Sequence, residues 1–116
     1  MGWAGLDQRA FPRVSAQCDI SIHDRIGSSV RAKTQNLGVG GVCVILTCEL
    51  EKLSQVHLKL TLENSEQTVE SDGRVVWMVR SKEPSSGKVS FDIGIEFLNL
   101  KPKDQEAIIV FIKSRV

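Results

Sequence analysis

Two arginines near the start of the 116-residue chain, Arg9 and Arg13, are the side chains best suited to bind an anion. Guanidinium groups are permanently charged and present a planar fork of N–H donors. Such a fork can hold phosphate oxygens, contact the O6 and N7 edge of a guanine, or stack on a base. Pro12 disfavours a regular helix here, so we expect an extended or turning segment. Taken alone, the pair is common and is more typical of a solvated basic surface before a strand.

A second candidate is the glycine-rich stretch from Asn36 to Gly41. Asparagine stabilises turns and offers a hydrogen-bonding amide, and Gly38 and Gly41 allow another group to approach the backbone closely. The stretch is not a dinucleotide-binding fingerprint, because Cys43 occupies the third glycine position and a β-branched run follows in place of a helix. Taken alone, it predicts a hairpin turn.

No motif of a known enzyme class is present: the serine-hydrolase elbow, the zinc-protease helix and the phosphate-binding loop are all missing. Cys18, Cys43 and Cys48 are odd in number and include no C-x-x-C pair, which indicates free, buried thiols in a reducing cytoplasm. His23 and His57 have no partner at ligand spacing. We therefore expect no catalytic residues, no metal and no cofactor.

The charge balance limits the possible partners. Fifteen Lys and Arg oppose fourteen Asp and Glu, a net charge of +1. This argues against binding of long nucleic acid, which usually requires a basic surplus. A barrel that stacks single-stranded bases is also disfavoured, because the chain has no tyrosine and few aromatic residues. No apolar run is long enough to predict membrane insertion.

Alternation of apolar and polar residues predicts that strands dominate the fold. We expect strands at 14–23, 30–35, 41–47, 56–62, 68–80 and 89–97. The continuous apolar run at 41–47 is typical of a well-covered strand. The segments between these strands contain turn-forming residues, and short connections favour antiparallel neighbours. The fold class is therefore all-β, a six-stranded antiparallel barrel.

The last segment changes to a helical period. Pro102 suits a first helical turn, and Ile108, Ile109, Phe111 and Ile112 form one apolar stripe. We expect a helix over 101–115 that covers one end of the barrel. A partner-binding helix is the alternative. The whole chain, 1–116, is expected to be one domain, with the barrel at 14–98.

Together these features resemble the PilZ domain, a bacterial receptor module for cyclic di-GMP. Its pattern is R-x-x-x-R, followed by Asp or Asn, then Ser or Ala, then Gly at fixed spacing. Arg9 and Arg13 match the first part, and Asn36, Gly38 and Gly41 match the second, apart from Gly38, where the family usually has serine. Residues 73–77, which end in Trp77, and residues 93–97 resemble two further strands of the family. The family fold, a six-stranded barrel with a C-terminal helix, agrees with the periodicity.

The resemblance implies that Arg9, Arg13, Asn36, Gly38 and Gly41 bind cyclic di-GMP, with Gln8 and Trp77 beside them. Segment 1–13 would be ordered by the ligand and would then engage a partner protein in the cytoplasm. Glycine at position 38 removes one hydroxyl contact, worth about 0.5–1.5 kcal/mol. That is roughly three- to tenfold in affinity. The alternative is a PilZ-like adaptor that binds no nucleotide and acts through protein contacts alone.

Overall fold

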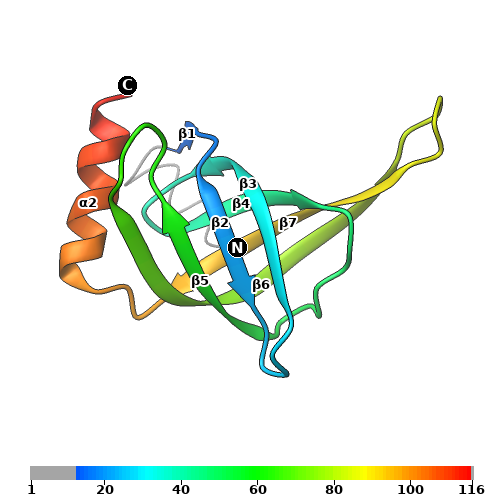
Figure 1. Ribbon diagram of the computed structural model, residues 1–116, viewed down its shortest axis with the longest axis horizontal. Coiled ribbons are helices and arrows are strands. Elements are labelled where there is room, and N and C mark those ends of the chain that lie inside the picture. Colours follow the sequence, from blue (N-terminus) through cyan, green and yellow to red (C-terminus); the bar gives the residue numbers. More distant parts are fainter. Residues whose placement is uncertain (1–12, 116) are drawn as a thin grey trace.

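The computed structural model describes residues 13–115, which form a β-barrel with one helix (Figure 1). The elements are β1 (Val14–Ser15), β2 (Asp19–His23), β3 (Ser29–Leu37), β4 (Gly41–Leu46), β5 (Gln55–Thr61), β6 (Thr68–Lys82), β7 (Val89–Leu98) and α2 (Pro102–Lys113). The predicted fold class, a six-stranded antiparallel barrel with a C-terminal helix, is confirmed.

The pairing of β3 with β4, two strands that are neighbours in sequence, closes the barrel. The order around the sheet is β3, β2, β5, β6, β7 and β4, and β4 also pairs with β3. Every pairing is antiparallel, and the short β1 adds to the end of β3. Closure satisfies the backbone groups that an open sheet would leave at its edges.

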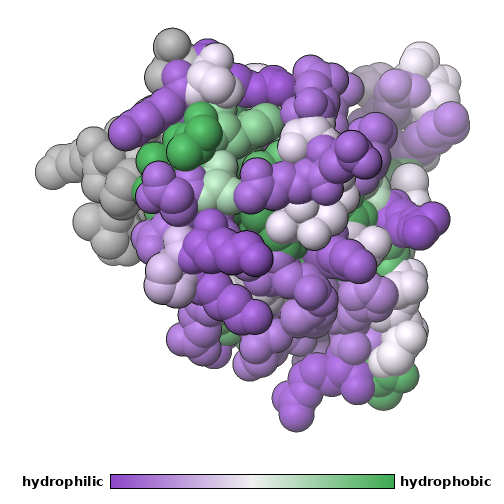
Figure 2. Space-filling view, turned by 60° about the vertical axis from the view of Figure 1, so that its left-hand side comes forward, coloured by the Kyte–Doolittle hydropathy of each residue, from purple (hydrophilic) through white to green (hydrophobic). Residues whose placement is uncertain are grey.

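The period of two sends alternate side chains into the barrel. Ile20, Ile22, Leu58 and Leu60 are at most 2% exposed, and the polar residues between them face outward. Each fully buried side chain of this size contributes about 1.5–3 kcal/mol. The outer surface is correspondingly hydrophilic, with apolar residues only in small groups on the face that Figure 2 shows.

The first predicted strand, 14–23, is wrong as a continuous element. The chain leaves the ladder between β1 and β2, where the fully buried Thr34 intervenes. Its Oγ1 accepts a hydrogen bond from the Cys18 N–H at 2.9 Å and donates one to the Ala16 carbonyl at 2.5 Å. Backbone bonds still join this stretch to β3, from the Ala16 N–H to the Gln35 carbonyl at 3.3 Å and from the Thr34 N–H to the Cys18 carbonyl at 2.9 Å. The hydroxyl therefore adds to an irregular ladder, and apolar periodicity contains no sign of it.

The predicted strand at 41–47 is well covered, but mainly on one face. β4 ends at Leu46, Ile45 is 42% exposed and Cys43 is half-buried, so this strand alternates like its neighbours. The expectation that all cysteines are buried fails as well. Cys18 is buried, but Cys48 is exposed in the loop after β4. An apolar run reports composition, and only the pairing decides which face is covered.

Helix α2 begins at Pro102, as expected, and its apolar stripe packs on the barrel through Ala107, Ile108, Phe111 and Ile112. It ends at Lys113, two residues before the predicted end, with Ser114 as the C-cap residue. No helix within residues 13–115 is long and apolar enough to cross a membrane.

Strands β6 and β7 continue beyond the barrel as a two-stranded hairpin (Figure 1). They stay paired as far as Lys82 and Val89, and a turn at 83–88 joins them. Residues 79–88 are all exposed. The hairpin is a solvated extension with no part in the core.

Candidate functional site

The structure brings together two of the predicted site residues, Arg13 and Asn36. β1 pairs with β3 through Val14 opposite Leu37 and Ser15 opposite Asn36, so the residue that precedes β1 arrives beside Asn36. The Nε and Nη2 groups of Arg13 both donate to the Asn36 Oδ1, at 3.0 and 2.6 Å. A cation and an amide from segments 23 residues apart thus form one polar group on the barrel surface.

Strand register extends this group into a row on the outside of the barrel. Asn36 lies opposite Cys43, Cys43 opposite Gly94, and Gly94 opposite Trp77. We call these four residues the outer row. It crosses β3, β4, β7 and β6, a width of about 14 Å at the usual strand spacing. The amide of the second motif and the tryptophan of a distant strand therefore share one surface.

Trp77 covers Gly94. A β-carbon built on Gly94 would collide with the indole ring of Trp77, so only glycine leaves room for the ring. The strand β6 bulges between Val75 and Trp77, which places the tryptophan opposite Gly94 on the outer surface. Trp77 is half-buried, so part of its ring remains accessible. Residues 73–77 and 93–97, the two stretches that resemble family strands, thus contact each other through Trp77 and Gly94.

The two motif glycines have structural reasons of their own. A β-carbon on Gly41 would collide with the carbonyl oxygen of Ile95, so this glycine lets β4 approach β7. A β-carbon on Gly38 would lie 3.1 Å from Cγ and 3.2 Å from Nη1 of Arg13. The Gly38 N–H also donates to the Gly41 carbonyl at 2.9 Å and closes the turn. Contacts between these glycines and a ligand stay a prediction.

Cys43 and Asp92 belong to this surface and were not predicted from the sequence. Burial raises the pKa of the Cys43 thiol, the Asp92 carboxylate raises it further, and the Arg13 charge lowers it. Arg13 therefore acts electrostatically on the middle of the outer row as well as on Asn36. Their place here follows from strand register, which leaves no local signal in the sequence.

Gln8 and Arg9, which were also predicted as site residues, lie outside the described residues. Of the arginine pair, the structure therefore describes only Arg13.

A separate polar cluster surrounds His57. Its Nδ1 lies 3.0 Å from Asp72 Oδ1 and its Nε2 lies 3.0 Å from Glu70 Oε2. These bonds, to Glu70 first and then to Asp72, raise the pKa of His57. The three side chains are 45–59% exposed on the outside of β5 and β6, so they form a surface clip between strands. No group of His, Cys, Asp or Glu within 13–115 is arranged to hold a metal.

Comparison with known proteins identifies relatives of this arrangement. The PilZ domain model matches residues 7–114. Among curated proteins, none matches the chain. The Bacillus subtilis inhibitor of motility MotI/DgrA is similar at 21% identity and a TM-score of 0.74, over 93% of this chain and 50% of its own.

Two further solved structures contain cyclic di-GMP. The PilZ domain of YcgR from Escherichia coli, with c-di-GMP, matches at 16% identity and a TM-score of 0.72, over 93% of this chain and 91% of its own. The K. pneumonia MrkH–c-di-GMP complex matches at 14% identity and a TM-score of 0.74, over 91% of this chain and 50% of its own. This chain thus spans half the length of MotI/DgrA and MrkH, and at these identities the likeness is one of fold.

Proposed function

Since this chain belongs to the PilZ domain family, we propose that it is a receptor domain for cyclic di-GMP that signals to a partner protein. The observation that supports this most is the outer row with Arg13 at its end. It offers a cation for phosphate, an amide for a guanine edge and an indole for stacking, all on one surface. The c-di-GMP complexes of YcgR and MrkH add support from the same fold.

On this proposal the ligand replaces the Arg13 guanidinium as the hydrogen-bond partner of Asn36. In the structure two N–H groups of Arg13 converge on the Asn36 Oδ1. A guanine edge also presents neighbouring N–H donors, so it can take the place of the guanidinium on that oxygen. Arg13 is then released to contact a phosphate or the other guanine. Arg9 and Gln8 would join it from segment 1–13.

The proposed receptor is not an enzyme and needs no cofactor. Ordering of segment 1–13 over the ligand changes the surface that a partner protein meets. We further propose that the domain works in the cytoplasm, where Cys18, Cys43 and Cys48, all free in the structure, would stay reduced.

Isothermal titration of the whole chain with cyclic di-GMP tests the proposal. Arg13→Ala and Asn36→Ala are each expected to weaken binding by about ten- to a hundredfold, because each removes a hydrogen bond that involves charge or a guanine edge. Arg9→Ala is expected to do the same. The matched control is Arg31→Ala, an exposed arginine on the same strand as Asn36 but outside the row. Absence of binding by the folded wild-type chain would refute nucleotide recognition.

One observation favours the adaptor alternative. The side chain of Arg13 packs against Gly38, where the family usually has serine, so the ligand must displace a contact that already exists. If wild-type protein gives no heat with the nucleotide and a purified partner binds equally with and without it, the adaptor is the better description.

A further inference from the structure

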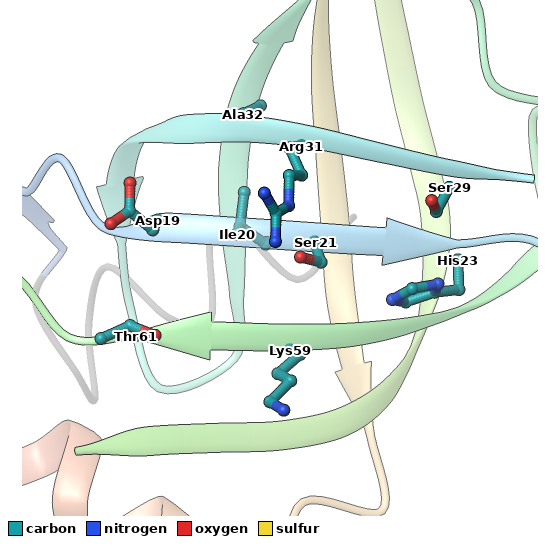
Figure 3. A pocket seen from close by; sticks show the side chains of 9 residues that line it. All are labelled: Asp19, Ile20, Ser21, His23, Ser29, Arg31, Ala32, Lys59 and Thr61. Carbon is teal, nitrogen blue, oxygen red and sulfur yellow. The ribbon is translucent and has the colours of Figure 1, made fainter. Parts of the chain in front are cut away.

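A hollow on the outside of the barrel lies away from the outer row. It has a volume of about 710 Å³ and is formed by β2, β3 and β5. Figure 3 shows Arg31 extending over β2 beside Ser21, with the His23 ring near β5; the Lys59 side chain lies at the far rim and extends from β5 away from β2. We call this feature the β2 hollow. It belongs to none of the motifs that define the proposed nucleotide site.

The hollow exists because small side chains lie between long ones. Ser21 on β2 is opposite both Arg31 on β3 and Lys59 on β5, so a serine separates two long cationic side chains. One step along, His23 is opposite Ser29. Adjacent strands are about 4.8 Å apart, so the two cations originate about 10 Å from each other across the serine. The small side chains leave a trough along β2.

The charge of the trough is positive. Arg31 and Lys59 are exposed cations that line it. The acidic side chain that lines it, Asp19, already pairs with Lys33 at 2.9 Å. Glu70 on β6 is opposite Lys59; it hydrogen-bonds to His57, and the Lys59 charge also helps to lower its pKa. Arg31 is thus available to an incoming anion, Lys59 adds positive charge at the rim although it also faces Glu70, and the serine hydroxyls can add hydrogen bonds.

The shape favours an extended chain over a single small ion. β2 runs for five residues along the trough, about 13 Å from first to last at the usual rise per residue. No charged side chain in it is buried, so nothing encloses a lone phosphate. An extended peptide with acidic side chains on one face matches both the length and the charge.

The hollow and the outer row occupy different sides of the barrel. The outer row crosses β3, β4, β7 and β6, and the hollow uses β3, β2 and β5. Only β3 is common to both, and Arg31 and Asn36 lie toward opposite ends of it. A partner in the hollow therefore leaves the nucleotide surface uncovered.

We propose that the β2 hollow is a docking site for an extended acidic segment of a partner protein. This inference deepens the partner role of the proposed function, and its test requires no nucleotide. Loss of nucleotide binding and loss of docking are therefore separate results.

The test uses a short fluorescent peptide of alternating glutamate and serine, which places all its carboxylates on one face when extended. Anisotropy at low salt measures binding to the whole chain, and amide NMR shifts locate it. Arg31→Glu combined with Lys59→Glu is expected to weaken binding by roughly tenfold or more, because attraction becomes repulsion. The matched control, Lys82→Glu with Lys88→Glu, makes the same change of net charge on the protruding hairpin.

The proposal is supported if the amide shifts are confined to β2, β3 and β5. Peptide binding should also be lost in the Arg31→Glu and Lys59→Glu variant and kept in the control. Amide spectra of the free variants verify that both are folded. Equal loss in the control would mean that net charge alone attracts the peptide and would overturn it. Inorganic phosphate that produces the same shifts and displaces the peptide would also overturn it, in favour of a small-anion site. Absence of binding at low salt would refute it outright.

Discussion

Replacing Gly94 with alanine places a methyl group where the indole of Trp77 lies. The new β-carbon would be closer to three indole atoms than real β-carbons come to a neighbour, so the ring must move. Forcing an extra methyl group into packed space costs about 1–3 kcal/mol. For a chain of this length, 1 kcal/mol corresponds to about 4 °C in Tm. The expected fall in Tm is therefore about 4–12 °C.

A double-mutant cycle assigns this cost to one contact. Thermal unfolding is measured for wild type, Gly94→Ala, Trp77→Ala and the double variant. With the indole removed, the alanine has room, and a strand favours alanine over glycine by about 0.5–1 kcal/mol. The Gly94 substitution is then expected to be neutral or stabilising. Nearly all of its cost should appear as coupling with Trp77.

The cycle can refute the packing argument directly. If Gly94→Ala costs the same with and without the indole, the collision with Trp77 is not the cause. If Gly94→Ala has the same Tm as wild type, the indole ring does not pack on Gly94. The single variant should also bind cyclic di-GMP more weakly, because a displaced indole no longer completes the outer row.

Three further substitutions test other parts of the structure. Thr34→Val leaves the Cys18 N–H without its hydroxyl acceptor and should cost about 1–3 kcal/mol in urea unfolding, whereas Thr34→Ser keeps the hydroxyl and should cost less. His57→Gln removes a histidine whose pKa is raised by two carboxylates. That histidine stabilises the fold below its unfolded pKa of about 6.5, and the benefit is lost as pH rises through the raised value. The Glu70 carboxylate, whose pKa is lowered by His57, contributes only above its own unfolded pKa of about 4.3. The difference in Tm between wild type and His57→Gln should therefore be largest in weakly acidic solution, between the two unfolded pKa values, and shrink toward alkaline pH. Gly38→Ser crowds Arg13, whose nearest atoms would lie 3.1 and 3.2 Å from the new β-carbon; it supplies the family hydroxyl and should tighten nucleotide binding by roughly three- to tenfold in calorimetry.

Each of these has a result that contradicts it. Equal stability of Thr34→Val and wild type would mean that the hydroxyl bonds are not needed to bridge the strand break. A Tm difference for His57→Gln that is constant with pH would show that the contribution of the His57 cluster does not depend on protonation of the histidine. Unchanged or weaker nucleotide affinity in Gly38→Ser would show that the contact between Arg13 and the turn matters more than the missing hydroxyl.

Local pattern alone determined the type of most elements. Alternation of apolar and polar residues is set by the geometry of a single strand, so Ile20, Ile22, Leu58 and Leu60 could be assigned to the core without a partner strand. Pro102 and the apolar stripe after it indicated the helix in the same way. The motif resemblance assigned Arg13 and Asn36 to one ligand site, so their proximity agrees with it, but the hydrogen bonds between them were not predicted.

Tertiary structure decided the rest, because the remaining features depend on which residues of different strands face each other. Register placed Trp77 over Gly94 and brought Cys43 into the outer row. A hydroxyl from β3 bridges the break in the first strand, and the β2 hollow arose from Ser21 lying between two longer side chains. A shift of one residue in any pairing would change these contacts, and it would turn that strand's own side chains to the opposite faces of the barrel.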